Sequence, residues 1–137
     1  MEFYEFMMEG NNFRAEKDVK FLNPLVMAFV GDSVYSLFVK SKELDIYSHK
    51  VDTLTKKTAE RVNAKSQQQA LFGVMPMLTE EEQDIVRRAR NANIHTKAKN
   101  YSIEEYRHAT AFEALIGYLY LTKNTKRLME ILNFVSN

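Results

Sequence analysis

The fold depends first on residues 25–39, which read Leu-Val-Met-Ala-Phe-Val-Gly-Asp-Ser-Val-Tyr-Ser-Leu-Phe-Val, with Asp32 in the middle. A second stretch of the same kind covers residues 111–121 and reads Ala-Phe-Glu-Ala-Leu-Ile-Gly-Tyr-Leu-Tyr-Leu, with Glu113 inside it. An apolar core rarely contains a carboxylate without a partner, a proton or a metal ion. The pattern therefore predicts two apolar helices that meet in the core and hold a hard cation between their acids, a layout typical of a metal-dependent hydrolase.

Small residues beside both acids predict how the two helices meet. Glycine inside a helix costs roughly 1 kcal/mol relative to alanine, so its presence next to each acid, at Gly31 and Gly117, indicates a close crossing. Such a crossing would bring Asp32 and Glu113 within reach of one ion. Two alternatives remain open: each acid pairs with a buried Arg, Lys or Tyr, or it points to solvent from the edge of its helix.

The composition is typical of one globular domain. The chain has 137 residues, of which 45% are hydrophobic, and it has no cysteine. The lack of cysteine fits a reducing compartment and excludes disulfides and thiolate zinc sites. The first six residues lack the basic region of a signal peptide, and the two acids interrupt the apolar runs before they reach membrane-spanning length. We therefore expect a cytoplasmic protein that does not enter a membrane.

Helix signals run along nearly the whole chain, because glycine (4) and proline (2) are scarce. Asn23-Pro24 predicts one helix start, and Thr79-x-x-Glu82 and Ser102-x-x-Glu105 are capping boxes that predict two more. We expect a leader over residues 1–20 and one all-α domain over 21–137. Its helices are expected over about 24–42, 52–75 (in one piece, or broken at Asn63), 79–91, 102–123 and 125–135.

Charge is distributed unevenly, although the net charge is only +1. Residues 85–103 contain no acid but carry Arg87, Arg88, Arg90, Lys97 and Lys99. A local basic segment on a near-neutral chain indicates an anionic ligand. The alternative for the arginines is that they stabilise a helix C-terminus, opposite the acidic first turn at residues 80–84.

Several stretches resemble the ribonuclease III family. Residues 29–34, Phe-Val-Gly-Asp-Ser-Val, are similar to the signature that carries the family's catalytic aspartate, and residues 110–117, Thr-Ala-Phe-Glu-Ala-Leu-Ile-Gly, are similar to the stretch with its catalytic glutamate. Residues 61–67, residues 88–92 and Tyr106-Arg107 resemble the Mini-ribonuclease III group, compact members that lack a double-stranded-RNA-binding domain. The resemblance covers about residues 20–135 and implies a ribonuclease III-like endonuclease fold.

Two acids of the full ribonuclease III pattern are missing, since their places fall on Ala28 and Thr110. The resemblance implies that Asp32 and Glu113 are the catalytic and metal-binding residues and that Mg²⁺ is the cofactor. It leaves open whether one or two metal ions act, and which groups replace the missing acids.

The resemblance also implies the substrate and the partners. The expected activity is hydrolysis of double-stranded RNA to 5′-phosphate ends, with the precursor of 23S ribosomal RNA as substrate. Arg61 and Lys65, one turn apart if their segment stays helical, would grip the duplex together with the basic group of residues 87–99. Phe29 is expected either in the core or at the interface of a homodimer. A ribosomal protein is a further candidate partner, and a non-catalytic RNA- or ribosome-binding module on the same fold is the alternative function.

Overall fold

The structure is a computed structural model that describes residues 2–9, 16–47, 49–92 and 102–136. All regular structure in these ranges is helical, which confirms the expected all-α class. The helices are α1 (Phe3–Glu9), α2 (Glu16–Lys20), α3 (Pro24–Ile46), α4 (Val51–Arg61), α5 (Ala64–Val74), the 3₁₀ turn η1 (Met75–Met77), α6 (Glu80–Arg90), α7 (Ile103–Leu121) and α8 (Thr125–Ser136).

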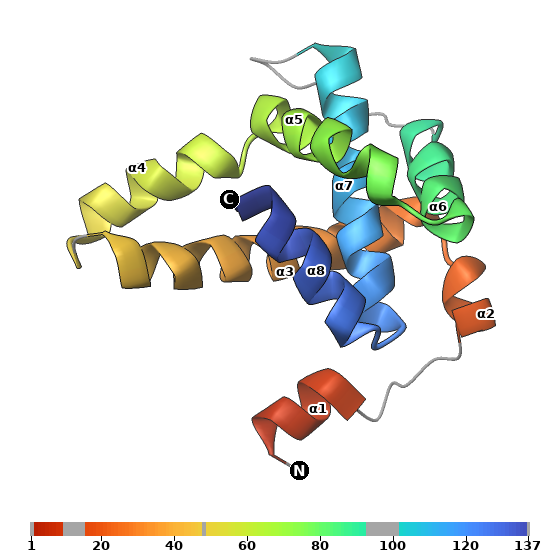
Figure 1. Cartoon of the computed structure of the whole chain (residues 1–137), viewed down its shortest axis with the longest axis horizontal. Helices are drawn as coiled ribbons and strands as arrows, with labels where there is room; N and C mark the ends of the chain where they lie inside the picture. Colours follow the sequence, from red (N-terminus) through yellow and green to blue (C-terminus); the bar gives the residue numbers. More distant parts are fainter. Residues whose placement is uncertain (1, 10–15, 48, 93–101, 137) are drawn as a thin grey trace.

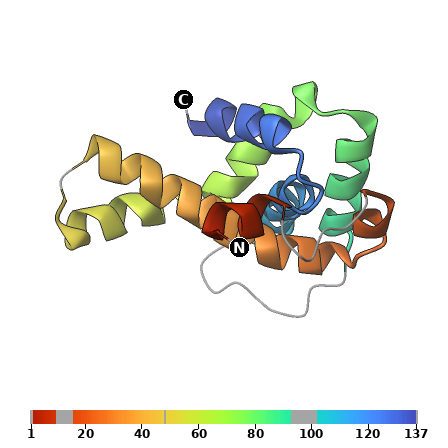
Figure 2. The same ribbon diagram turned by 90° about the horizontal axis from the view of Figure 1, so that it is seen from below.

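Helix α7 is the centre of the core. Figure 1 shows α3 crossing it, and the turned view of Figure 2 places α3, α5, α6 and α8 around it. Nearly every residue of α7 from Ala109 to Leu119 is buried, including Phe112, Leu115 and Ile116, which are completely inaccessible. A helix that is apolar on all sides must be enclosed by its neighbours, and α7 meets that condition.

The crossing of α3 and α7 is a backbone contact, as the glycines predict. A Cβ atom on Gly31 would lie 1.8 Å from the carbonyl oxygen of Glu113, and one on Gly117 would lie 1.9 Å from the carbonyl oxygen of Met27. Real Cβ atoms never approach that closely, so only glycine fits at either position. The prediction of a close crossing at these residues is confirmed.

The predicted helix starts are confirmed. The Asn23 side chain accepts from the amide of Leu25 at 2.9 Å. Both capping boxes are complete, since Thr79 and Glu82 bond reciprocally, as do Ser102 and Glu105. These bonds satisfy backbone amides that would otherwise be unpaired at the first turn of each helix.

The C-terminal half of α3 and all of α4 form an arm that extends from the body (Figures 1 and 2). Helix α3 continues to Ile46, four residues beyond the expected end at 42. Glu43 explains the extension: its side chain is buried and accepts a hydrogen bond of 2.6 Å from the Thr58 hydroxyl on α4. A contact between distant segments thus holds the last turns of a helix that local sequence does not predict.

The segment expected over 52–75 is two helices. The break falls at residues 62–63, where Asn63 caps α5 by accepting from the amide of Ser66 at 2.9 Å. The chain then passes through Pro76 in η1. The alternative that breaks this segment at Asn63 is therefore correct.

A buried ion pair joins α6 to α8. Glu82 is only 4% exposed, and Arg127 donates to its two carboxylate oxygens at 2.8 and 2.9 Å. Arg127 also donates to the carbonyl of Met77 at 2.7 Å. The guanidinium therefore anchors the N-terminus of α6 to the helix that closes the core.

The N-terminal segment is partly integrated into the core. Val19 on α2 is completely buried, whereas Phe3 and Tyr4 on α1 are largely exposed. The division into a leader over 1–20 and a domain over 21–137 stays a prediction. None of the helices in the described residues is long and apolar enough to span a membrane.

Candidate active site

The two predicted acids meet beside the helix crossing. Gly31 precedes Asp32 on α3, and it touches the backbone of Glu113 on α7, so the contact that requires glycine also aligns the two carboxyl groups. Their side chains lie within hydrogen-bonding reach of each other. The expectation that the acids converge is thus met by the backbone geometry.

The carboxyl of Glu113 is strongly perturbed. Its pKa is raised from 4.5 to about 8. Burial is the largest cause of this rise, and the hydrogen bond to Asp32 and the negative charge of Asp32 contribute the rest. A hydrogen bond from Gln67 opposes the rise in the pKa of Glu113. Two carboxylates that repel each other in this way attract a cation, because a divalent ion between them removes both the repulsion and the proton.

The two carboxyl groups are less buried than their place in apolar stretches predicts. Asp32 is not buried in the core but exposed, and Glu113 is only partly covered. The reason is that α3 keeps one apolar face open: Val26, Phe29 and Leu37 are 46%, 78% and 61% exposed. Asp32 therefore matches the alternative in which an acid points to solvent from a helix edge, although it still reaches Glu113.

Ala28 and Thr110 stand where the ribonuclease III pattern has two further acids, and neither side chain has a charge that could bind a metal ion. Ala28 and Thr110 are both nearly buried, and the Thr110 hydroxyl donates to the carbonyl of Tyr106 at 3.0 Å within α7. Among the described residues, no group of three or more His, Cys, Asp or Glu side chains is placed to hold a metal ion. The site accordingly offers two carboxylates.

Gln67 is a site residue that the sequence argument missed. It is 4% exposed on α5, and its amide Nε2 donates to Glu113 Oε2 at 3.4 Å. The residue belongs to one of the stretches quoted for the family resemblance, but a single glutamine on an amphipathic helix gives no signal of its target. Only the packing of α5 on α7 reveals it.

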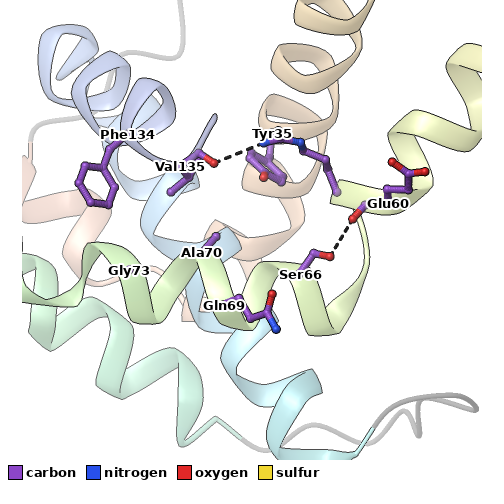
Figure 3. A pocket seen from close by; sticks show the side chains of 9 residues that line it. Tyr35, Glu60, Ser66, Gln69, Ala70, Gly73, Phe134 and Val135 are labelled. Atoms are coloured by element: carbon purple, nitrogen blue, oxygen red, sulfur yellow. Dashed lines mark hydrogen bonds between the residues drawn. The ribbon is translucent and has the colours of Figure 1, made fainter. Parts of the chain in front are cut away.

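Arg61 and Lys65 do not share a helix face, because the helix breaks between them. Arg61 Nη1 donates to the carbonyl of Val135 at 3.4 Å, near the C-terminus of α8. This contact lies at a cavity of about 360 Å³ that residues of α3, α4, α5 and α8 line, with Tyr35 and Val135 among the lining residues (Figure 3). Lys65 is exposed on the first turn of α5. The condition for placing these two residues one turn apart, an unbroken helix, is therefore not met, and their role in RNA binding stays a prediction.

The basic residues of α6 are arranged unevenly. Arg87 forms an ion pair with Asp84, one turn earlier on the same helix. Arg88 Nη2 reaches the carbonyl of Leu22 at 3.4 Å, and Arg90 is exposed in the last turn. Lys97 and Lys99 lie outside the described residues. Arg87 and Arg88 thus make contacts within α6 and with its neighbour, and all three arginines lie in the last turn of α6. This agrees in part with the alternative that they stabilise a helix C-terminus.

The perturbed pKa of Glu113 predicts how the stability of the metal-free protein depends on pH. Between pH 4.5 and about 8, folded Glu113 holds a proton that the unfolded chain releases. The free energy of unfolding therefore falls as pH rises through this range. We expect Glu113→Gln to gain stability relative to the unaltered protein from pH 5 to pH 9, measured by urea unfolding in EDTA. A difference that is constant with pH would show that Glu113 titrates normally.

The comparisons with known proteins agree with the fold and identify the family of the chain. Residues 25–124 match the family model described as Ribonuclease III domain. A protein of Thermoanaerobacter sp. (strain X514) named Mini-ribonuclease 3 is 42% identical over 91% of this chain and 88% of its own length. A Mini-ribonuclease 3 of Brevibacillus brevis is 47% identical over 84% of this chain and 86% of its own length.

A solved structure supports the same assignment. The crystal structure of a protein from Fusobacterium nucleatum superposes with a TM-score of 0.80 at 34% identity, covering 87% of this chain and 95% of that one. The fold and the matched domain define the class, a ribonuclease III-type endonuclease. The chain therefore belongs to the ribonuclease III family, within its Mini-ribonuclease 3 group, and is an endoribonuclease.

Proposed function

We propose that the protein cleaves double-stranded RNA in a Mg²⁺-dependent reaction centred on Asp32 and Glu113, leaving 5′-phosphate and 3′-hydroxyl ends. The observation that carries this proposal is the α3–α7 crossing, where glycine-only contacts hold the two acids together. A binding module has no need to keep two repelling carboxylates at such a crossing, and the enzymatic class of the relatives favours catalysis over the alternative of a non-catalytic module.

The donor set fits Mg²⁺. Carboxylate oxygens are the ligands that this hard cation prefers, and it commonly binds through one or two carboxylates while waters and substrate phosphates complete its shell. When bound, the ion would polarise the scissile phosphate and lower the pKa of a water molecule that attacks it. Asp32 is exposed to solvent and therefore accessible to a substrate, whereas Glu113 is partly covered and accepts a hydrogen bond from Gln67.

The substrate class is tested with matched RNAs. We expect the protein with Mg²⁺ to cleave a long RNA duplex and to leave each of its two strands intact when they are supplied separately. Cleavage of the single strands at the same rate would contradict the proposal for double-stranded RNA. A DNA duplex of the same sequence is the control for recognition of the 2′-hydroxyl groups.

We propose that the natural duplex lies in the 23S ribosomal RNA precursor, that a ribosomal protein assists, and that the reaction takes place in the cytoplasm. The resemblance to the Mini-ribonuclease III group and the cysteine-free composition support it. A precursor transcript should be cut at fixed positions in its terminal stem, whereas an unrelated duplex of equal length should be cut at scattered positions or more slowly.

We further propose that the protein acts as a homodimer through α3. The exposed face of this helix carries Val26, Phe29 and Leu37, and an apolar groove of about 650 Å³ lies further along it, between α3 and α4. A twofold axis crossing α3 between Phe29 and Leu44 would bring the partner's Phe29 to this groove. Two active sites related by that axis suit the two strands of a duplex.

Phe29→Ala is expected to weaken the dimer by about 2 kcal/mol, or roughly 30-fold in dissociation constant, because a buried aromatic anchor is lost from the interface. Sedimentation over a range of concentrations measures the change. Phe72→Ala is the matched control, since Phe72 is also an exposed aromatic (52%) but lies on α5. A monomeric unaltered protein at micromolar concentration would contradict the dimer.

The basic group beyond α6 is proposed to bind RNA phosphates. Replacing Lys97 and Lys99 with alanine should make the slope of log affinity against log salt concentration shallower by about one to two units. The measurement uses RNA binding in Ca²⁺, with Lys126→Ala as the control because Lys126 is an exposed lysine on α8. An unchanged slope with unchanged affinity would place the duplex elsewhere.

A further inference from the structure

We infer that Gln67 is a positioning residue for Glu113, so that the site is built from three helices rather than from the two that carry its acids. This inference rests on the proposed function, because it concerns how the carboxylate is presented to a divalent cation. The amide of Gln67 would hold one oxygen of Glu113 in place and leave the carboxylate facing Asp32.

Residues before and after Gln67 on α5 fix its position. At the start of α5, Asn63 caps the helix, and the backbone amide of Gln67 donates to the Asn63 carbonyl at 3.0 Å. Further along, Leu71 and Val74 are 2% and 0% exposed in the core cluster that includes α7. A side chain on the first turn of such a helix has little freedom, and that of Gln67 is 4% exposed.

The contact between Gln67 and Glu113 is one that orients a carboxylate without neutralising it. Gln67 Nε2 donates to Glu113 Oε2 at 3.4 Å, and an amide adds no positive charge. A lysine or arginine at this place would neutralise the carboxylate and compete with a cation, whereas glutamine orients it and keeps its charge for the ion. Because Ala28 and Thr110 supply no acids, the two remaining carboxylates depend more on such support.

The adjacent residue provides an internal control. Gln68 is also a glutamine on α5 that contacts α7, but its Nε2 lies 2.8 Å from His108 Nδ1, and the ring of Phe72 packs edge-on against the same imidazole. Gln68 thus joins the same two helices without touching the carboxylates. If glutamines on α5 serve only to join the helices, the loss of either should have the same consequences.

The test compares Gln67→Met with Gln68→Met, since methionine keeps the unbranched shape and removes the amide. Binding of Mn²⁺ to the protein without RNA is measured by electron paramagnetic resonance, together with the melting temperature in EDTA. We expect Gln67→Met to weaken Mn²⁺ binding by about 10- to 100-fold, the usual cost of removing a group that holds a metal ligand. Gln68→Met should leave Mn²⁺ binding unchanged.

In duplex cleavage, Gln67→Met should need more Mg²⁺ to reach its full rate while KM for the RNA stays the same.

Mn²⁺ binding distinguishes the role of Gln67 from the existence of the metal site. Equal Mn²⁺ affinity in Gln67→Met and the unaltered protein would overturn the inference and leave the metal site standing. Failure of the unaltered protein to bind Mn²⁺ would overturn the metal site itself, and the inference with it. If Gln67→Met does not fold, Gln67→Asn replaces it, since its shorter amide remains polar but does not reach Glu113, and the same loss of Mn²⁺ affinity is expected.

Discussion

Gly31→Ala is expected to destabilise the protein by at least about 3 kcal/mol, the upper end of the range for overpacked cores. The new methyl group would lie 1.8 Å from the carbonyl oxygen of Glu113 and 2.8 Å from the backbone nitrogen of Gly117. Both obstacles are backbone atoms in the middle of α7, so they cannot move aside as a flexible side chain can. Urea unfolding in EDTA measures the loss of stability.

Gly73→Ala is the matched control for this prediction. Gly73 is also a helical glycine, but a Cβ there meets only Phe134 Cε1, at an ordinary 3.7 Å. Alanine should therefore stabilise α5 by about 1 kcal/mol, because glycine is the poorer helix former. If Gly31→Ala behaved like Gly73→Ala, the close crossing of α3 and α7 would be wrong.

Asp32→Asn and Glu113→Gln are each expected to reduce the rate of duplex cleavage by at least about a thousandfold, since a metal ion at the phosphate contributes several kcal/mol to the transition state. The metal-free variants should melt at the same temperature as the unaltered protein or higher, because Glu113→Gln removes the buried carboxyl group and Asp32→Asn removes the negative charge that disfavours its ionisation. The two measurements together separate a lost metal site from a lost fold.

Asp45→Asn provides the control for Asp32, because Asp45 is another exposed aspartate on α3, far along the arm. It should cleave at the normal rate. If Asp32→Asn also cleaved at the normal rate, the metal-site proposal would be wrong. If Asp32→Asn unfolded instead, this acid would be a structural partner and not a ligand.

Much of the fold follows from local sequence signals. The capping boxes at Thr79 and Ser102 fix helix starts through bonds between neighbouring residues, so a short motif contains the whole cause. The crossing was predictable for a different reason. Glycine is unfavourable in a helix, and its presence at residues 31 and 117, in helices that are otherwise apolar, required a close approach.

The features that sequence reasoning missed depend on contacts between distant segments. The last turns of α3 are held by the bond between Glu43 and Thr58, and the orientation of Glu113 is held by Gln67, 46 positions earlier in the chain. The exposure of Asp32 was also hidden, because the apolar residues of α3 serve two faces. One face packs on α7, and the other, with Phe29, is open in the single chain.

One divalent cation is proposed to contact both Asp32 and Glu113, and cleavage of the polypeptide by bound Fe²⁺ would locate that ion. Fe²⁺ bound in place of Mg²⁺ generates hydroxyl radicals in ascorbate and peroxide, which cut the polypeptide next to the metal. We expect two cuts, one near residue 32 and one near residue 113, which excess Mg²⁺ suppresses and which Asp32→Asn abolishes. Cuts at other positions, or cuts at these positions that persist in excess Mg²⁺ and in Asp32→Asn, would contradict this proposal.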